Sequence, residues 1–272
     1  MMWIISILLA LVGVYLFLIA PDRTIVNTSR LNGWLYAHRG LHDGNVNVPE
    51  NSMEAFRLAV ENGYGMELDV QLTRDHQLVV HHDGSLKRVC GVDKNLRDVD
   101  YADLPLLPDG SRIPLFSEVI SMVNGRAPLI VEVKHYGGAA KVAKAAHEVL
   151  STYRGAYCVE SFDPTAMRYF RKHAPKIIRG QLASGGEWNK KELNFVSYFA
   201  LKHLLINVLS RPHFVAYSVP TDKVPSVWLM KHLYKPHLAC WTVRSQEVLD
   251  YSRRQGYELP IFELFTPAKE QA

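Results

Sequence analysis

The stretch Gly65-Met66-Glu67-Leu68-Asp69-Val70-Gln71-Leu72 is strand-like and places two carboxylates inside an apolar run. Side chains alternate between the two faces of a strand, so Glu67 and Asp69 point the same way. Burying an acidic pair among apolar neighbours is costly unless the pair has a partner, so we expect both carboxylates to meet a ligand. Taken alone, the pattern also fits a polar strand face with surface ion pairs.

Strand-like runs alternate with helical patterns along most of the chain. The predicted strands cover residues 34–38, 65–72, 128–134, 157–162, 177–183, 213–219, 238–243 and 259–265. The predicted helices cover residues 52–61, 117–123, 139–153, 164–173, 191–209, 227–233 and 246–255. This alternation predicts an α/β fold, a (β/α)8 TIM barrel. The length of 272 residues and the hydrophobic content of 48% suit one such barrel, although two smaller domains also fit.

Two segments do not fit a minimal barrel. Residues 78–114 follow the second strand, begin with a short strand over 78–81 and continue as a stretch rich in Gly and Asp. This is too long for a plain loop, so we predict a small insertion at about residues 84–114. Residues 193–209 are apolar almost all round. That pattern fits either a helix buried under the anchor or a neighbour, or a surface in contact with lipid.

The amino-terminal region is strongly apolar. Residues 3–20 carry no charge, and as a helix of about 27 Å they are long enough to cross a bilayer. We predict a single-pass transmembrane anchor over residues 1–21, a linker over 22–32 and the barrel over 33–272. A removed signal peptide is the weaker alternative, because no Lys or Arg precedes the run and Pro21 follows Ala20. Arg23 and Arg30 favour a cytoplasmic barrel, but two arginines leave the side of the membrane open.

Charge and cysteine content exclude several classes of protein. The net charge is +4 with scattered Lys and Arg, which does not indicate a nucleic-acid partner and is compatible with an anionic substrate or a lipid surface. Cys90, Cys158 and Cys240 lie far apart, without a Cys-x-x-Cys pair. The sequence therefore predicts neither a disulfide framework nor a zinc site.

A third carboxylate extends the acidic pair. Glu132 lies on another predicted strand, and the carboxyl ends of barrel strands converge on one mouth. Glu67, Asp69 and Glu132 can therefore share one ion there. Because all-oxygen ligation suits hard cations, we predict one divalent cation, Ca²⁺ or Mg²⁺, as the cofactor.

Two histidines occupy strand ends near this predicted cation. His38 ends the first strand and His82 ends the hairpin after the second. An acid and a base on either side of a phosphorus atom need such a pair, although single histidines are more often structural. His81 points to the other face, so we do not expect it to be catalytic.

Positive charge for a phosphate group is available in the same region. Arg39 offers a planar fork of donors and Lys134 a point charge for non-bridging oxygens. The alternative is that both are structural, with Arg39 paired to Glu50 and Lys134 to Glu132.

Several motifs resemble, in order and spacing, those of the glycerophosphodiester phosphodiesterase family. The resemblance covers residues 36–243, most of the chain, and the combination of motifs is specific. The matching motifs are His38-Arg39-Gly40, Pro49-Glu50-Asn51-Ser52 with Ala55-Phe56, Glu67-Leu68-Asp69-Val70 with Thr73, His82-Asp83 with Leu86 and Arg88, Ile113-Pro114, Glu132-Val133-Lys134, Ser161-Phe162-Asp163 and Trp241-Thr242-Val243.

The resemblance implies a TIM barrel with an insertion after the second strand. It also implies metal-dependent hydrolysis of glycerophosphodiesters to an alcohol and glycerol 3-phosphate. The family's site residues fall on Glu67, Asp69 and Glu132 for the metal, on His38 and His82 for catalysis, and on Arg39, Lys134 and a supporting Glu50 for the phosphate.

One region departs from the family. Residues 256–267 lack its Gly-x-Asp-x-Ile-x-Thr-Asp-x-Pro pattern, although strand-like character survives. The metal cluster is not affected by this departure. It bears instead on how the barrel closes and on the wall of the substrate pocket.

We therefore predict a membrane-anchored phosphodiesterase acting on a small glycerophosphodiester. In the expected mechanism a substrate hydroxyl attacks phosphorus, and water opens the resulting cyclic phosphate, with His38 as the first base and His82 as the acid. The alternatives are lysophospholipase D-like action on membrane lysophospholipids and a catalytically silent membrane-bound binding barrel. A metal-dependent amidohydrolase would need a His-x-His on the first strand, which Ala37-His38-Arg39 lacks.

Overall fold

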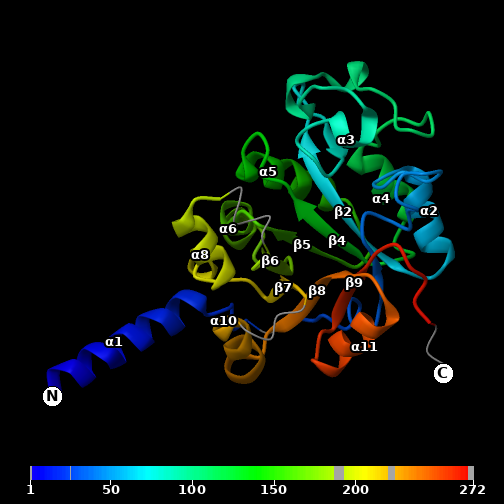
Figure 1. Cartoon of the computed structure of the whole chain (residues 1–272). Helices are drawn as coiled ribbons and strands as arrows, with labels where there is room; N and C mark the ends of the chain where they lie inside the picture. The colour runs from blue at the N-terminus through cyan, green and yellow to red at the C-terminus, as the bar shows by residue number, and fades with distance from the viewer. Residues whose placement is uncertain (1, 25, 187–192, 220–223, 269–272) are drawn as a thin grey trace.

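The structure is a computed structural model that describes residues 2–24, 26–186, 193–219 and 224–268. Eight parallel strands form a closed ring in the order β1-β2-β4-β5-β6-β7-β8-β9, and β9 pairs with β1 (Figure 1). The prediction of a (β/α)8 TIM barrel is confirmed. The strands are β1 (Tyr36–Ala37), β2 (Gly65–Leu72), β4 (Leu129–Val133), β5 (Tyr157–Ser161), β6 (Arg179–Ala183), β7 (Phe214–Ser218), β8 (His237–Val243) and β9 (Leu259–Phe262).

Helices lie around the outside of this ring (Figure 1). Several begin at a side chain that caps the first turn: Ser52, Asp163 and Ser245 each accept a hydrogen bond from a backbone N–H two or three residues later. The helices are α1 (Met2–Ile19), α2 (Met53–Glu61), α3 (Lys87–Cys90), α4 (Phe116–Val123), α5 (Ala139–Leu150), α6 (Pro164–His173), α8 (Phe195–Lys202), α9 (Asn207–Ser210), α10 (Pro225–Leu229), the π-helical turn η3 (Met230–Tyr234) and α11 (Gln246–Arg254).

The core has an inner and an outer part. Inside the ring, Tyr36, Ile130 and Phe214 belong to a buried apolar cluster that also includes Leu31 from the segment before β1. Gly180 leaves room there for the Phe214 ring, because a Cβ at residue 180 would lie 2.1 Å from it. A larger cluster fills the space between the strands and the helices. The filled interior confines the site to the mouth of the barrel.

A small subdomain follows the second barrel strand. Strand β3 (Leu78–Val80) pairs antiparallel with β2, and two short 3₁₀ turns, η1 (Leu96–Asp98) and η2 (Tyr101–Asp103), come after α3. These segments have a buried apolar cluster of their own, which includes Val79, Leu86 and Leu96. The predicted insertion is thus an independent packing unit on one side of the barrel (Figure 1).

An apolar helix precedes the barrel, as the sequence indicates. Helix α1 has a mean hydropathy of 2.7 and only 6% of its span is buried, so by length and composition it is a candidate to cross a membrane. Its last turn is different, because Ile19 is fully buried against the main core. Helix α1 therefore projects from the barrel and is held at its carboxyl-terminal end (Figure 1).

The expectation of one helix over residues 191–209 is wrong. Residues 191 and 192 lie outside the described part of the chain, and the remainder forms two helices, α8 and α9. The break falls at Leu204, which is fully buried with a φ of 58°. A left-handed backbone conformation cannot continue an α-helix.

Candidate active site

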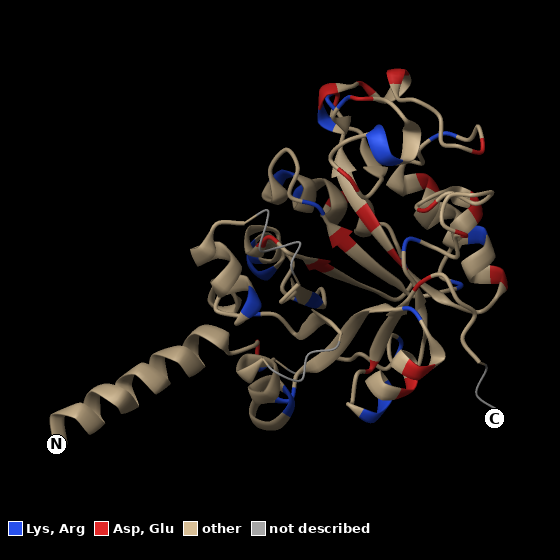
Figure 2. Cartoon of the chain, viewed as in Figure 1, with Lys and Arg blue, Asp and Glu red and all other residues tan. Residues whose placement is uncertain are grey.

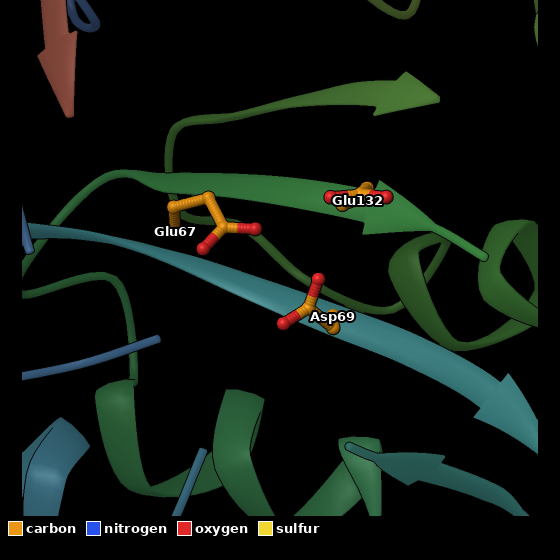
Figure 3. Close-up of side chains that lie close together, drawn as sticks. All are labelled: Glu67, Asp69 and Glu132. Atoms are coloured by element: carbon orange, nitrogen blue, oxygen red, sulfur yellow. The ribbon is translucent and has the colours of Figure 1, made fainter. Parts of the chain in front are cut away.

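Three carboxylates meet at the mouth of the barrel. Glu67 and Asp69 lie on β2, and Asp69 is paired in register with Glu132 on β4. One oxygen from each lies within 4.8 Å of the others, and all three residues are buried (Figure 3). The shared strand face that the sequence predicts brings these three groups together.

The electrostatics of this cluster suit a bound cation. Burial, together with the charge of Asp69, raises the pKa of Glu67 well above its usual range, and burial raises the pKa of Glu132 to about 7. Oε1 of Glu67 is buried and has no hydrogen-bond partner among the described residues. An all-carboxylate cluster with an unsatisfied oxygen matches the ligand preference of a hard divalent cation.

Lys134 is the internal counter-ion of the cluster. Its Nζ lies 2.8 Å from Oδ1 of Asp69 and 2.7 Å from Oε1 of Glu132. Burial alone would raise the pKa of Asp69, but the charges of Lys134, His82 and Arg39 together hold that pKa well below its usual range. The two carboxylates in turn raise the pKa of Lys134 against the effect of burial. The side chain is therefore a fixed positive charge.

His38 stands at the end of β1 with both ring nitrogens near carboxylates. Its Nδ1 lies 2.7 Å from Oε1 of Glu263, and its Nε2 lies 3.9 Å from Oε2 of Glu67. Burial lowers the pKa of His38, although Glu263 opposes this effect. The imidazole is thus held neutral near pH 7, with Nε2 toward the acidic cluster.

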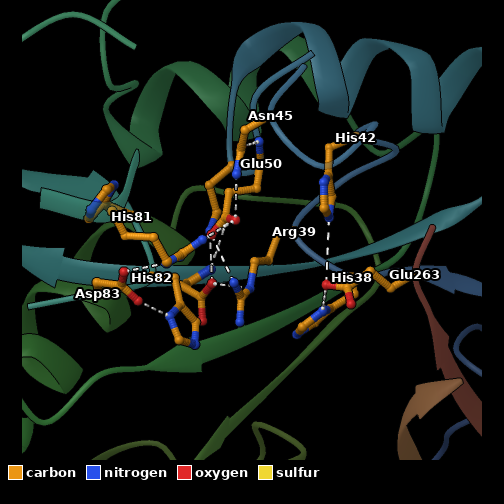
Figure 4. A network of polar contacts seen from close by, with 12 residues as sticks. His38, Arg39, His42, Asn45, Glu50, His81, His82, Asp83 and Glu263 are labelled. Carbon is orange, nitrogen blue, oxygen red and sulfur yellow. Dashed lines mark hydrogen bonds and ion pairs between the residues drawn. The ribbon is translucent and has the colours of Figure 1, made fainter. Parts of the chain in front are cut away.

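His82 approaches from the hairpin after β2. Its Nδ1 lies 2.6 Å from Oδ1 of Asp83, which leaves Nε2 available. Burial and then the charge of Lys134 lower the pKa of His82 to about 4. His81 points away from His82 and is itself buried (Figure 4). The two neighbouring histidines therefore face different surroundings.

Arg39 and Glu50 form an ion-pair network beside the cluster (Figure 4). Arg39 donates from its backbone N–H to Oε2 of Glu67 and from its side chain to Glu50 at 2.8 Å. Glu50 also accepts two hydrogen bonds from Arg88, and both arginines outweigh burial to lower its pKa to about 2. This position is consistent with both roles predicted for Arg39, binding of a phosphate group and a structural ion pair with Glu50.

The loop that carries Arg39 has an unusual backbone. Arg39 and Asn51 both have a φ of 56°, and a Cβ at Gly40 would lie 2.8 Å from Ala55. Asn51 donates from Nδ2 to Asp69 at 2.8 Å, and its backbone N–H donates to the carbonyl of Arg39. This conformation aims the Arg39 N–H at the acidic cluster.

Three further residues, to which the sequence pattern assigns no role, lie at the site. Glu263 follows β9. Its Oε2 lies 2.7 Å from Nη2 of Arg244, and its Oε1 lies 3.6 Å from Nε2 of His42. Its signal is an acidic residue at the position of the Asp in the family's Thr-Asp pair, which the altered neighbours obscure. Asp83 and Arg88 appear in a matching motif, but only their spatial contacts with His82 and Glu50 indicate what they do.

Comparison with known proteins agrees with this geometry. The model of the glycerophosphoryl diester phosphodiesterase family matches residues 38–259. A solved structure of glycerophosphodiester phosphodiesterase from Thermotoga maritima has a TM-score of 0.65 and 25% identity, with 89% of this chain and 96% of that chain covered.

Curated relatives differ in how much they share. A glycerophosphodiester phosphodiesterase of Caldanaerobacter subterraneus is 32% identical over 166 residues, which is 55% of this chain and 66% of the relative. Lysophospholipase D GDPD1 of Homo sapiens is 39% identical over 102 residues, which is 36% of this chain and 32% of the relative. The chain thus spans about a third of the human relative's length.

Proposed function

The chain belongs to the glycerophosphoryl diester phosphodiesterase family and is thereby a phosphoric diester hydrolase, and we propose that it cleaves glycerophosphodiesters to an alcohol and glycerol 3-phosphate. The observation that carries the proposal is the meeting of three buried carboxylates with the Nε2 side of His38 at one barrel mouth. A silent binding barrel would not need two histidines with supporting carboxylates beside the cluster.

Glu67, Asp69 and Glu132 would hold one divalent cation, Ca²⁺ or Mg²⁺. When bound, such an ion supplies charge neutralisation for a phosphate oxygen and lowers the pKa of a coordinated hydroxyl. Asn51 fixes Asp69 through its Nδ2, and the Arg39 N–H fixes Glu67. These contacts orient the ligand oxygens before any substrate arrives.

Phosphate binding is assigned to Arg39 and Lys134, with Glu50 in support. Lys134 is a buried positive charge at the cluster, and Nε of Arg39 lies 3.7 Å from Oδ2 of Asp69. Glu50 holds the guanidinium of Arg39 in one orientation. Two fixed positive charges that need no rearrangement stabilise the charge that develops on phosphorus oxygens in the transition state.

His38 is proposed as the first base. Glu263 accepts from Nδ1–H, so the lone pair of the neutral ring lies on Nε2, on the side of Glu67. The attacking substrate hydroxyl gives its proton to this nitrogen as its oxygen bonds to phosphorus. The lowered pKa of His38 favours the neutral form that a base requires.

His82 is proposed as the acid that protonates the leaving alcohol. Asp83 accepts from its Nδ1–H and stabilises the imidazolium form. Lys134 is one cause of the lowered pKa of His82, and a bound phosphate offsets that charge. Substrate binding therefore raises the pKa of His82 toward the range in which an acid works. In the second step water attacks the cyclic phosphate and the two histidines exchange roles.

The test is an assay of the purified full chain against glycerophosphocholine and glycerophosphoglycerol. We expect glycerol 3-phosphate and the free alcohol as products from at least one of them. Choline phosphate or no product would contradict the proposal, because the first requires cleavage of the other ester bond.

A second candidate substrate is a membrane lysophospholipid. Two observations favour it: the apolar helix α1, and similarity to a relative named as a lysophospholipase D. The same assay with lysophosphatidylcholine in mixed micelles distinguishes the substrates. Release of choline with lysophosphatidic acid would extend the activity to lipids, and no release would restrict it to water-soluble diesters.

For the chain as a whole we propose three parts, an anchor over residues 1–21, a linker over 22–32 and a barrel over 33–272 that includes the insertion. Helix α1 is proposed to remain as the membrane anchor, because its last turn contributes the fully buried Ile19 to the main core. Loss of this helix on processing would expose that part of the core. Fractionation of full-length protein with carbonate-washed membranes tests the anchor.

A further inference from the structure

Helix α1 is fixed to the barrel by polar contacts at its carboxyl-terminal end. Tyr234 donates to the carbonyl of Leu16 at 2.7 Å, and Nδ2 of Asn207 donates to the carbonyl of Ile19 at 2.8 Å. Arg211 donates to the carbonyl of Ala20 at 2.8 Å. These donors satisfy the last carbonyls of the helix, which have no partner within it. They come from α9, η3 and the residue after α9, so α1 and these elements form one rigid unit.

The level at which a membrane would meet this unit can be located. The sequence of α1 and of the residues that follow carries no charge up to Asp22 and Arg23. Charged residues mark the boundary between the hydrocarbon core and the polar interface. Because α9 and η3 contact α1 within its last apolar turn, the surface of the barrel beside α1 lies at the level of that interface.

Exposed apolar side chains lie on the helices near this point. We use the name collar for Phe195, Val196, Phe199, Trp228 and Leu233, which lie on α8, α10 and η3. Their exposed fractions are 78%, 73%, 46%, 59% and 55%. Helices α8 and α10 lie on either side of the place where α1 reaches the barrel (Figure 1). Large exposed apolar groups gathered on neighbouring elements mark a candidate contact surface.

Within the described parts of this region, Lys and Arg occur without Asp or Glu. Residues 193–219 and 224–237 contain no Asp or Glu, and their basic residues are Lys202, Arg211, Lys231 and Lys235. Acidic side chains lie instead mainly on the insertion, α2, α11 and the central strands of the barrel (Figure 2). Basic residues around apolar ones are the composition of protein surfaces that rest on anionic lipid.

We propose that the collar docks into the interfacial region of the same bilayer that α1 crosses, so that the barrel rests on the membrane in one orientation. The occupant of this apolar face is lipid, because the helices that carry it lie beside the place where the exposed apolar helix α1 reaches the barrel, and basic residues accompany them. Aromatic groups such as Trp228 suit the headgroup level. This inference rests on the proposed anchoring of α1.

Depth-dependent fluorescence quenching tests the docking. The full chain carrying Cys90→Ser is reconstituted in phosphatidylcholine vesicles with phosphatidylglycerol, with a single labelled cysteine introduced by Val196→Cys, Leu233→Cys, Leu9→Cys or Leu106→Cys. Cys158 and Cys240 are buried and so are not labelled. Leu106 is a matched control, since it is 53% exposed but lies in the insertion. Lipids that carry nitroxide groups near the headgroup and deep in the acyl chain serve as quenchers.

We expect shallow nitroxides to remove most of the emission at positions 196 and 233, deep nitroxides to remove it at position 9, and neither to affect position 106. Quenching at position 9 without quenching at 196 and 233 would overturn the docking while leaving the anchor intact. No quenching at position 9 would overturn both. Emission at 196 that changes with protein concentration but not with nitroxide lipid would assign the collar to a second copy of the chain and overturn the proposal.

Discussion

His38 Nδ1 lies 2.7 Å from Oε1 of Glu263, so the two ends of the barrel's strand order meet at one imidazole. His38 follows β1 and Glu263 follows β9, and these two strands pair to close the ring. The second oxygen of Glu263 receives Arg244 at 2.7 Å. Closure of the barrel therefore fixes the orientation of the proposed base.

Glu263→Gln is expected to lower kcat roughly 10- to 100-fold, because an amide does not stabilise the protonated ring that forms during the reaction. Glu263 raises the pKa of His38, so its replacement lowers that pKa further. The acidic limb of kcat/KM against pH should consequently move to lower pH. A pH–rate profile of both proteins measures this shift.

Glu258→Gln is the matched control for that variant. Glu258 also contacts the Nδ1 of a histidine, His237, but at the start of β8. We expect its pH–rate profile to follow that of the unmodified protein. A fall in kcat equal to that of Glu263→Gln, or an unmoved profile in Glu263→Gln, would argue against orientation of His38 by Glu263.

His82→Ala is expected to lower turnover about 10²- to 10⁴-fold, the usual effect of losing a general acid or base. Substrate affinity should change little, because phosphate binding is assigned to Arg39 and Lys134. The neighbouring variant His81→Gln keeps most of the volume of a buried side chain that faces away from the site. Stopped-assay kinetics should show that the turnover of His81→Gln lies within a few-fold of that of the parent. A larger loss of turnover in His81→Gln than in His82→Ala would exchange the roles of the two histidines.

The sequence was sufficient for most of the barrel because its strands are continuous apolar runs bounded by helix caps. The meeting of Glu67, Asp69 and Glu132 could also be predicted from the sequence. Strand alternation puts the first two on one face, and the converging strand ends bring the third to the same mouth. Two features could not be predicted from the sequence. Glu263 acts on His38 from 225 residues away, which only the closure of the ring reveals. The break at Leu204 depends on a buried side chain in a left-handed conformation, which no local pattern encodes.

Asp22→Asn is expected to destabilise the barrel. Asp22 follows α1 and pairs with the guanidinium of Arg179, which is 1% exposed. Leaving a buried charge without its partner costs about 3 kcal/mol. Thermal unfolding in detergent should show a melting temperature lower by roughly 5–10 °C. Asp93→Asn, which removes the exposed pair with Lys87 at 2.9 Å, should change it by about 1 °C or less. Equal effects would contradict a structural role for the buried pair.

His213 should make the protein less stable as the pH falls. Burial and then Arg179 lower the pKa of His213 from 6.5 to about 4. Between these values the unfolded chain binds a proton that the folded protein does not, so the free energy of unfolding falls as the pH drops from 6.5 to 4. The loss amounts to about 3 kcal/mol at most.

Melting temperatures of His213→Gln and of the parent, compared between pH 7 and pH 4, measure this contribution. We expect a flatter dependence in the variant, because glutamine does not titrate. Parallel curves would show that His213 is not the titrating group.

The most direct test of the account is glycerol 3-phosphate release from glycerophosphocholine with added Ca²⁺ or Mg²⁺ and with chelator, for the parent, Glu132→Gln and Glu160→Gln. Glu160 is a matched control, since it is buried and pairs in register with Glu132 but lies outside the group of three carboxylates. We expect activity that needs the added cation in the parent and in Glu160→Gln, and no activity in Glu132→Gln. Undiminished hydrolysis in chelator, or in Glu132→Gln, would contradict it.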